Sequence, residues 1–301
     1  MFFRIKSGAN PHTRDRFGRR KQVDPARAGF QWNTLRLVLE NHGVKVHVLA
    51  PCQEEPGLVF PANAGFRYGE NFYLSNLNRA RAGEREHYRK KLSGLGIPVL
   101  DLPFSYPFEG EADFIPVAHP SGDPARALFL FTYGRMERQR WVPHWGLPPY
   151  RRIYGFRSDQ RVGGGLQSIV GTPEVLPLAL TNEFHYHGDT VLCPFGPRQE
   201  FLLAYLKALS SDAQRALHRR LGDRLLPLSD EDGQGFAANS FQIVKEHYGE
   251  KVKVLLMPDG LTERLYGQIR ARGVVPCPVD VSEFLEKGGG AVKCMLLNLA
   301  I

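Results

Sequence analysis

The sequence has few cysteines and no long apolar run, and both shortages narrow the class of protein. Its 301 residues include only four cysteines, which form no CxxC pair and no zinc-type spacing. No stretch of about twenty apolar residues is present to cross a membrane. The first residues also lack the apolar core of a secretory signal peptide. We therefore expect a cytoplasmic protein whose thiols are free and which has no membrane span.

Acidic residues are fewer than basic ones, and the formal net charge is +8. Part of the excess lies in residues 14–21, RDRFGRRK. Such a run can contact nucleic acid, but most basic runs are solvated surface, and no nucleic-acid-binding motif accompanies this one. We therefore do not expect a nucleic-acid partner. The same charge would also attract small anionic molecules.

A helix, a glycine and a short apolar strand recur along the chain. The first copy has a helix that begins at Asp24-Pro25 and ends at Gly43, followed by an alternating strand over residues 44–50. The later glycines are Gly96, Gly171, Gly222 and Gly273, so three of the four intervals are close to fifty residues. The strands that follow them are expected at residues 97–102, 175–180, 225–228 and 274–279.

A period near fifty residues with mixed helix and strand indicates an array or a closed ring of similar units. Five units are too few to protect both ends of an open array, whereas a closed ring has no ends. We therefore predict an α/β fold in which a single domain, residues 1–301, forms a five-fold pseudo-symmetric β/α propeller. Two more short strands are expected, at residues 2–5 and near Cys294.

Each repeat carries a chemically capable group shortly after its strand. In chain order these groups are Asn63, Glu109 with Asp113, His187, Asn239 and Cys294. In a closed ring, equivalent positions converge on the central axis, so we expect these side chains to meet there. A thiol, an imidazole and paired carboxylates together are typical of nucleophilic catalysis. Taken singly, each has a plainer interpretation, such as a turn residue, a solvated carboxylate or a buried thiol.

A metal site is the alternative suggested by Glu183, His185 and His187. The spacing is that of a strand, and no third ligand is clearly placed, so the sequence does not favour a metal. Neither a metal nor an organic cofactor is expected.

Six stretches of the sequence resemble the guanidine-modifying enzymes of the pentein fold. This group comprises arginine deiminases, arginine dihydrolases, dimethylarginine hydrolases and amidinotransferases. The stretches are Asn10-Pro11, 60–65 (FPANAG), 108–113 (FEGEAD), 155–159 (GFRSD), 186–189 (YHGD) and 282–294, which ends in GGGAVKC. They extend over essentially the whole chain, and the last is the most specific. The resemblance implies a five-fold propeller, in agreement with the period.

The resemblance also implies roles for individual residues. Cys294 would be the nucleophile, His187 the general acid and base, and Glu109 with Asp113 the anchors of a guanidinium group. Asp189 would face the guanidinium or orient the histidine. The remaining candidates for substrate contact are Asn10, Asn63, Arg81, Arg157 and Asn239, with the two arginines suited to a substrate carboxylate.

One position departs from the family pattern. Many members have an aspartate before the Asn-Ala-Gly motif for the amino-acid end of the substrate, and here that place is taken by Gly57. Recognition of an α-amino group is therefore open, and the substrate need not be arginine itself. The chain also lacks room for the helical insertion of larger deiminases. No role beyond packing is assigned to the remaining cysteines, Cys52, Cys193 and Cys277.

Three hypotheses for function follow. The first is hydrolysis of a guanidino compound through a cysteine adduct, which releases ammonia or an alkylamine and a ureido product. The second is transfer of the amidino group to an acceptor amine by the same residues; hydrolysis is preferred because no feature indicates that water is excluded. The third is a non-catalytic binding protein of the same fold, which leaves the thiol, imidazole and carboxylates unexplained. A homo-oligomer is compatible with each.

Overall fold

Four copies of one ββαβ unit contain most of the strands in the computed structural model. The structure describes residues 3–5, 10–15, 17–137, 139–144, 147–247 and 250–299. In each unit two strands pair antiparallel, a helix follows, and a third strand pairs parallel with the second. This repeated order confirms that the sequence repeat is a structural one.

The units have the following bounds. The first has β1 (Gly65–Tyr68), β2 (Asn71–Leu74), α2 (Glu84–Gly94) and β3 (Val99–Asp101). The second has β4 (Phe114–Val117), β5 (Leu128–Tyr133), α3 (Gly163–Val170) and β8 (Glu174–Ala179). The third has β9 (Leu192–Phe195), β10 (Phe201–Ala204), α4 (Ser211–Leu221) and β11 (Leu225–Pro227). The fourth has β12 (Phe241–His247), β13 (Glu250–Pro258), α6 (Glu263–Arg270) and β14 (Val275–Val279).

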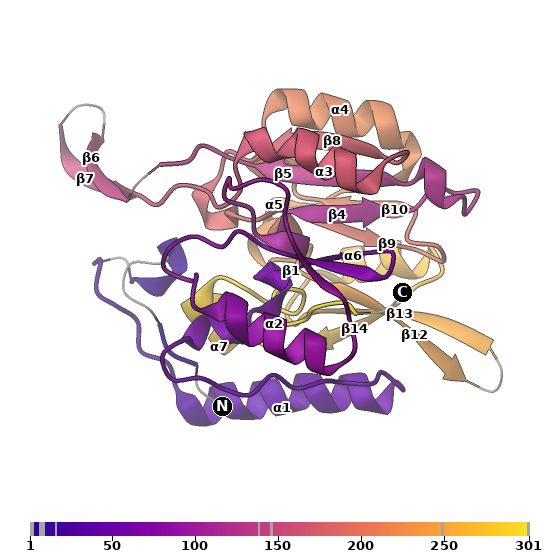
Figure 1. Cartoon of the computed structure of the whole chain (residues 1–301), viewed down its shortest axis with the longest axis horizontal. Helices are drawn as coiled ribbons and strands as arrows, with labels where there is room; N and C mark the ends of the chain where they lie inside the picture. The colour runs from indigo at the N-terminus through magenta and orange to yellow at the C-terminus, as the bar shows by residue number, and fades with distance from the viewer. Residues whose placement is uncertain are drawn as a thin grey trace.

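The other elements connect or cover these units. They are α1 (Pro25–Asn41), β6 (Arg140–His144), β7 (Leu147–Ile153), α5 (Asp230–Gln234) and α7 (Ser282–Gly288). Short 3-10 turns are η1 (Pro11–Thr13), η2 (Pro56–Val59), η3 (Pro61–Ala64), η4 (Gly110–Ala112), η5 (Pro124–Arg126), η6 (Gln160–Val162), η7 (Glu183–His185), η8 (Gly188–Thr190), η9 (Leu206–Ala208) and η10 (Gly222–Arg224). Helices α1 and α4 lie at opposite edges of the molecule (Figure 1).

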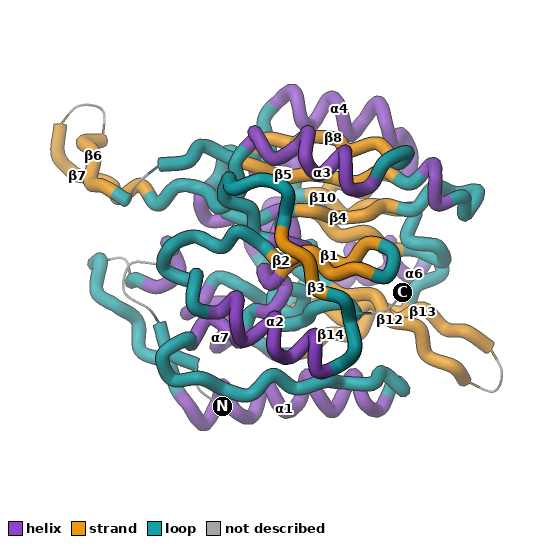
Figure 2. Tube along the Cα trace, in the orientation of Figure 1, coloured by secondary structure: helices purple, strands orange, loops and turns teal. Residues whose placement is uncertain are grey.

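Two hairpins extend from the body on opposite sides. One is β6–β7 and the other is the outer part of β12–β13, as Figure 2 shows. The β6–β7 hairpin is inserted between β5 and α3 of the second unit. This insertion explains why the interval from Gly96 to Gly171 is longer than the other three.

All five repeat glycines have the backbone conformation that the sequence pattern predicts. Their φ angles are positive and lie between 52° and 78°. Glycine adopts this left-handed region without the steric cost that a β-carbon brings, so it ends a helix and turns the chain toward the next strand. The helix–glycine–strand prediction is confirmed for the four complete units.

The predicted strands around α1 are wrong in the described residues. Residues 44–50 belong to no strand, and neither do residues 3–5 or 296–299; residue 2 and the last two residues lie outside the described part. The alternation in residues 44–50 has another cause. Its apolar side chains, such as Val46 and Leu49, pack toward neighbouring hydrophobic clusters and line an apolar hollow of about 590 Å³.

Aromatic packing fixes the loop that carries two of the predicted site residues. Phe108 and Phe114 are fully buried and pack against each other and against Phe66. Each buried phenylalanine contributes about 1.5–3 kcal/mol relative to an exposed one. The residues between them, including Glu109 and Asp113, are therefore held in place from both ends.

Two glycines allow the central loops to touch. A β-carbon on Gly110 would lie 2.5 Å from the carbonyl oxygen and 2.6 Å from the nitrogen of Gly65, and Gly110 has a φ of 59°. Only glycine tolerates both the conformation and the contact. The FPANAG and FEGEAD loops therefore meet backbone to backbone.

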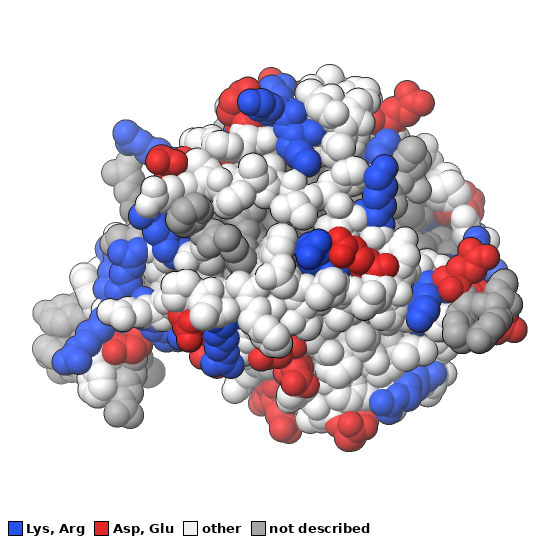
Figure 3. Space-filling view, turned by 90° about the horizontal axis from the view of Figure 1, so that it is seen from below, with Lys and Arg blue, Asp and Glu red and all other residues white. Residues whose placement is uncertain are grey.

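The net positive charge is spread over the surface. On the face seen in Figure 3, lysine and arginine side chains alternate with acidic ones around a broad uncharged area. Among the described residues, no helix is both long enough and apolar enough to span a bilayer.

Candidate active site

Cys294 lies in a turn that follows α7 and the glycine run. The helix ends at Gly288, and Gly289 caps it with a left-handed φ of 75°. Gly290 then passes so close that a β-carbon on it would lie 2.8 Å from Cβ of Cys294. The glycines thus let the chain fold tightly onto the cysteine, whose side chain is only 4% exposed.

Asn239 holds this turn in place with every polar atom of its side chain. Its Oδ1 accepts from the backbone nitrogens of Ala291 and Cys294, at 2.8 and 3.2 Å. Its Nδ2 donates to the backbone oxygen of Asp189 at 3.0 Å and to Sγ of Cys294 at 3.2 Å. These contacts leave no polar atom of Asn239 for a substrate, so it fixes the thiol, in contrast to the expected substrate contact.

The thiol of Cys294 donates to Oδ2 of Asp189 at 3.3 Å. The second oxygen of Asp189 is buried and has no hydrogen-bond partner among the described residues. Burial raises the pKa of Asp189 to about 6, although nearby His187 and Lys293 lower it. Burial and then the neighbouring Asp189 raise the pKa of Cys294 well above its usual value. The site therefore holds a neutral thiol beside an unsatisfied acceptor.

His187 lies between two carboxylates. Its Nδ1 is 3.0 Å from Oδ2 of Asp113, and its Nε2 is 3.2 Å from Oε2 of Glu109. Burial alone would lower the pKa of this histidine, but Asp113 and then Glu109 raise it to about 9. The imidazole is therefore protonated at neutral pH and has an acidic hydrogen on each nitrogen.

Asp113 accepts four hydrogen bonds. Oδ1 accepts from Oγ1 of Thr132 at 2.7 Å and from the backbone nitrogen of Gly188 at 2.9 Å. Oδ2 accepts from Oγ of Ser158 at 2.6 Å and lies at hydrogen-bond distance from His187. A carboxylate offers about four lone-pair positions, and all of them are used. Asp113 therefore does not fit the expected role of guanidinium anchor; its position is that of a residue that orients the imidazole.

Glu109 is the carboxylate that remains suited to a cation. It is 1% exposed; its Oε1 accepts from Nδ2 of Asn78 at 2.8 Å, and its Oε2 accepts from Nδ2 of Asn63 at 3.1 Å. Burial raises its pKa, but His187 and the nearby guanidinium of Arg81 outweigh this and lower it to about 2. Glu109 is therefore ionised throughout the neutral range.

Asn63 lies where the sequence pattern places it. Its Nδ2 is 3.1 Å from Nε2 of His187 as well as from Glu109. The amide of Asn63 thus lies between Glu109 and His187. A change in the protonation of His187 therefore changes which of these two residues the amide binds.

Arg81 and Gly57 are explained together. Nε and Nη2 of Arg81 donate to the buried carboxylate of Glu84 at 2.9 and 2.6 Å, and only Nη1 approaches Glu109, at 3.7 Å. A β-carbon on Gly57 would lie 2.1 Å from Oε1 of Glu84. An aspartate at position 57 does not fit, because Glu84 already occupies that space. Arg81 is therefore an ion-pair partner inside the protein, which differs from the expected carboxylate contact.

Asn10 and Arg157 border the other side of the site. Nδ2 of Asn10 donates to the backbone oxygen of Gly288 at 2.8 Å and to the hydroxyl of Tyr186 at 3.0 Å. Asn10 therefore supports the glycine run and is engaged within the protein, where a substrate contact was expected. The guanidinium of Arg157 lies 5.2 Å from the ring centre of Tyr186, in a cation–π arrangement.

Four contributing residues are absent from the sequence-based predictions, and one of them is Asn78, which donates to Glu109. Ser158 also accepts from the backbone nitrogen of Glu109, so it joins the two acidic residues; its place in the GFRSD motif was the only indication of a role. Thr132 on β5 and Glu84 on α2 had no motif to distinguish them. Thr132 and Ser158 act through contacts with residues distant in sequence, which a pattern of local spacing does not reveal. Glu84 pairs with Arg81 three residues away, but the space that it fills is beside the distant Gly57.

His185, one of the residues that suggested a metal site, makes packing contacts with aromatic rings. The ring of His185 stacks on Phe236, with centres 4.6 Å apart, and lies 5.1 Å from the ring of Tyr205. Burial lowers its pKa to about 4. In the part of the chain that the structure describes, no three His, Cys, Asp or Glu side chains are grouped to hold a metal ion.

Comparison with known proteins shows which enzymes this chain is similar to. Residues 179–301 match the model of the eukaryotic N,N-dimethylarginine dimethylhydrolases. The bifunctional arginine dihydrolase/ornithine cyclodeaminase AgrE of Nostoc sp. is 29% identical over 276 residues, which are 91% of this chain and 33% of AgrE. The N(G),N(G)-dimethylarginine dimethylaminohydrolase of Mycobacterium tuberculosis is 28% identical over 279 residues, which are 92% of this chain and 77% of that protein.

This chain is similar to guanidine-modifying enzymes of the pentein superfamily. Among solved structures, the N-terminal domain of the arginine dihydrolase ArgZ, in a variant bound to its substrate, superposes on this chain with a TM-score of 0.75 and 25% identity. The match covers 96% of this chain and 91% of that one. Another ArgZ structure carries a covalently bound reaction intermediate. This chain spans about a third of the length of AgrE and of the ArgZ of Synechocystis sp..

Proposed function

We propose that this chain is a cysteine-dependent hydrolase of a guanidino compound. The observation that carries the proposal is the buried, unpartnered Oδ1 of Asp189 on the residue that also accepts the Cys294 thiol. An unsatisfied buried acceptor costs about 1–3 kcal/mol, so it indicates a missing donor. A planar guanidinium, whose N–H groups form a fork, satisfies carboxylates in this way.

The first step is binding of the cation between Asp189 and Glu109. Its positive charge offsets the effects that raise the pKa of Cys294, so the thiol gives up its proton through Oδ2 of Asp189 to bulk water, and the thiolate attacks the guanidinium carbon. The C–S bond forms and a tetrahedral adduct results. His187 donates a proton to the departing nitrogen as the C–N bond breaks, and an S-alkylthiouronium remains on the cysteine.

The second step is attack by water on the thiouronium carbon. His187, now neutral, accepts a proton from the water, and the C–S bond breaks to return the thiol. The ureido product and one amine have then been released, and one water has been consumed. Asp113 holds the imidazole in one orientation through both proton transfers, because its remaining lone pairs are fixed by Thr132, Ser158 and Gly188.

Arginine dihydrolysis is a second candidate, since AgrE and ArgZ both carry that name and align over 91% of this chain. In it the enzyme attacks the ureido carbon again, a second water is consumed, and an amino acid, carbon dioxide and a second ammonia result. Gly57 leaves no aspartate for the α-amino group, and Arg157 is the remaining candidate for a substrate carboxylate. Arginine, a substituted arginine and a decarboxylated analogue are therefore all to be compared.

The position of α1 supports a fifth unit. Gly43 ends α1 with a φ of 78°, as the four other repeat glycines end their helices. Residues 44–50 and 295–299 both contribute to the hydrophobic clusters next to α1 and the first unit. We include in the proposal that these segments complete a five-fold ring, so that residues 1–301 form one domain; a cytoplasmic location stays a prediction.

The proposal is tested by a substrate screen. Arginine, N-methylated arginines and agmatine are incubated with the protein, and products and protein mass are followed by mass spectrometry. We expect ammonia or an alkylamine without any added acceptor amine, and a mass adduct on Cys294 when the reaction is stopped early. Citrulline as the end product indicates one hydrolysis, and ornithine indicates two. Product that forms only when an acceptor amine is present would indicate amidino transfer instead.

The pKa values predict an alkaline pH optimum for kcat/KM. The reacting form has a thiolate and an imidazolium, but the thiol pKa is raised well above its usual value and that of His187 to about 9. Below about pH 8.5 the reacting fraction of the free enzyme therefore rises about tenfold per pH unit. Initial rates at low substrate and constant ionic strength check this. A flat or falling profile between about pH 7 and 8.5 would contradict the assignment.

A further inference from the structure

A second polar pocket lies away from Cys294, at the other end of the strands that carry the site. Asp113 directly precedes β4, and Thr132 near the end of β5 contacts it. The pocket is formed at the opposite ends of these strands, by the last residues of β4, the first of β5 and β8, and the C-terminal end of α4 with η10. Its volume is about 390 Å³, which suits a small ligand.

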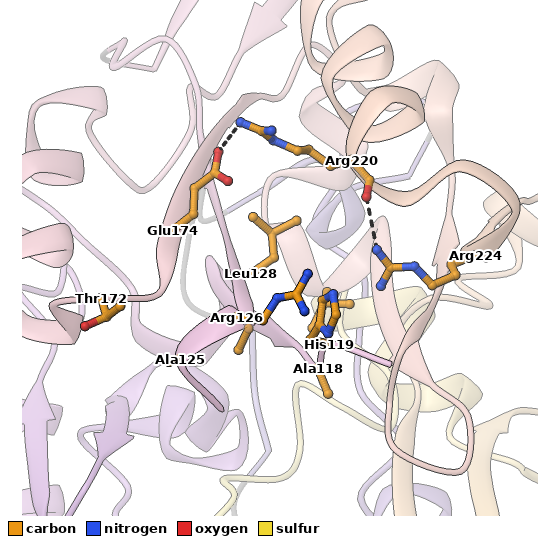
Figure 4. A pocket seen from close by; sticks show the side chains of 11 residues that line it. Ala118, His119, Ala125, Arg126, Leu128, Thr172, Glu174, Arg220 and Arg224 are labelled. Carbon is orange, nitrogen blue, oxygen red and sulfur yellow. Dashed lines mark hydrogen bonds and ion pairs between the residues drawn. The ribbon is translucent and has the colours of Figure 1, made fainter. Parts of the chain in front are cut away.

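Three arginines line the pocket and only one carboxylate does. Figure 4 shows Arg126, Arg220 and Arg224 around the cavity, with Glu174 at one side. Arg220 pairs with Glu174 at 2.6 Å. The guanidinium of Arg224 donates only to backbone oxygens, those of Arg220 at 3.0 Å and Glu200 at 3.3 Å.

Arg126 is the most available of the three cations. In the described part of the chain, no carboxylate lies within ion-pair distance of its guanidinium. The nearest acidic residue in sequence, Asp123, uses Oδ1 to cap the turn at the nitrogen of Ala125, at 2.9 Å. Two guanidinium groups thus share a concave surface without an anionic partner between them.

His119 adds a neutral donor to this cationic surface. Its Nδ1 lies 2.7 Å from Oγ and 3.2 Å from the backbone nitrogen of Ser121, and the backbone N–H fits the tautomer whose hydrogen is on Nε2. Burial, followed by Arg126 and Arg224, lowers the pKa of His119. Burial also lowers the pKa of Arg224, and Glu200 only partly offsets it. The shift of His119 has the direction expected beside two guanidinium groups, whereas that of Arg224 reflects burial.

We propose that this pocket binds a small phosphate-type oxyanion, either free phosphate or the phosphate group of a small monoester. Arg126 and Arg224 would bind its oxygens through their forked N–H groups, and Nε2 of His119 would donate a further hydrogen bond. The apolar floor, which includes Val117 and Leu128, leaves space for an organic group beyond the phosphate. The assignment is independent of the reaction proposed for Cys294.

The bound anion would link the loop between β4 and β5 to the C-terminal end of α4 and η10. The loop with His119 and Arg126 joins β4 to β5, whereas Arg220 and Arg224 come from α4 and η10 of the next unit. An anion that bridges them favours the folded state by its binding free energy. Phosphate should therefore raise the melting temperature, in addition to giving a calorimetric binding isotherm.

The test is titration calorimetry and thermal unfolding of the whole chain with inorganic phosphate and with a phosphate monoester such as glycerol phosphate. Sodium chloride at matched ionic strength controls for screening. We expect saturable binding that Arg126→Gln and Arg224→Gln each weaken by about tenfold to a hundredfold, the range for one charge-assisted hydrogen-bonding group. A clear preference for the monoester identifies the organic group as part of the ligand, and equal affinity identifies free phosphate.

Arg215→Gln is the matched control variant. Arg215 is on α4 outside the pocket, pairs with Asp212 and is 63% exposed. Its substitution removes one positive charge from α4 without changing the pocket, so phosphate binding should be unchanged. The proposal is overturned if phosphate and chloride act alike at equal ionic strength, or if all three variants bind phosphate as the native protein does. Arg126 lies in an exposed loop, so its variant is informative even if Arg224→Gln does not fold.

Discussion

Replacing Cys294 by alanine is expected to lower kcat by at least about 10³-fold, because no other nucleophile is placed at the guanidinium carbon. The fold should persist, because the turn is held mainly by the backbone contacts of Ala291 and Cys294 to Asn239. Loss of Sγ leaves one amide hydrogen of Asn239 without its acceptor, while the other still binds the backbone oxygen of Asp189. Steady-state rates with the best substrate from the screen, together with circular dichroism, measure both effects.

Cys193→Ala is the matched control. Cys193 is equally buried, at 2% exposed, and its thiol lies 3.5 Å from the backbone oxygen of Ser240. Burial raises its pKa to about 12, so it is not ionised near neutral pH. We expect this variant to retain kcat and to lose only some stability. Activity that survives undiminished in Cys294→Ala, or a substrate adduct on a different cysteine, would remove the proposed mechanism.

The fold could be predicted to the extent that it depends on local backbone chemistry. Each repeat glycine, such as Gly222 or Gly273, marks a place where a helix ends in a positive φ, and no other residue adopts that conformation as readily. These glycines therefore recur at similar intervals although the residues between them differ from repeat to repeat. The insertion of β6–β7 lengthens one interval without removing its glycine.

The segments around α1 could not be predicted in the same way. Residues 44–50 alternate between apolar and polar side chains as a strand does, but alternation reports only which side chains are turned inward. A strand also needs a neighbour that supplies hydrogen bonds, and that neighbour comes from a distant part of the chain. Among the described residues this segment pairs with no strand, and it lines an apolar hollow instead.

In the site, too, some features could be predicted from the sequence and others could not. Sequence spacing indicated which side chains converge, since Asn63, Glu109 and His187 do contact one another. Sequence spacing could not indicate how many hydrogen bonds each of the site side chains makes within the protein. Asp113 and Asn239 use every polar atom of their side chains within the protein, so the proposed mechanism assigns them the support of His187 and Cys294.

Gly57 shows the opposite case, in which a departure from the family pattern is explained only by three-dimensional contacts. The carboxylate of Glu84, from a helix 27 residues further along the chain, fills the space beside it and is neutralised by Arg81. An acidic group is thus present near this corner of the site, but it is bound to a protein cation. An acidic residue in the sequence therefore does not by itself provide a carboxylate that is free to bind a substrate.

Asp113→Asn is expected to destabilise the protein by about 3–5 kcal/mol near neutral pH, the range for removing one partner of a buried ion pair. The amide nitrogen cannot accept a hydrogen bond, so two of the four donors around Asp113 lose their acceptor. Those donors come from Thr132, Ser158, Gly188 and His187. Urea unfolding measures the loss.

The pH dependence of this loss distinguishes the ion pair from simple packing. The pKa of His187 is raised to about 9 from an ordinary value of 6.5, so the pair contributes about 3 kcal/mol below pH 6.5. That contribution is lost as the pH rises through 9. The gap in stability between the native protein and Asp113→Asn should therefore be widest below about pH 6.5 and should narrow by about pH 10.

Asp232→Asn provides the control for this experiment. Asp232 is also 1% exposed and accepts from Oγ of Ser229 and from the nitrogen and Oγ1 of Thr262, but it has no histidine partner. Its replacement should lower stability by an amount that stays constant over the same pH range. A constant gap for Asp113→Asn as well would show that Asp113 does not raise the pKa of His187, and the general acid would then have to be sought elsewhere.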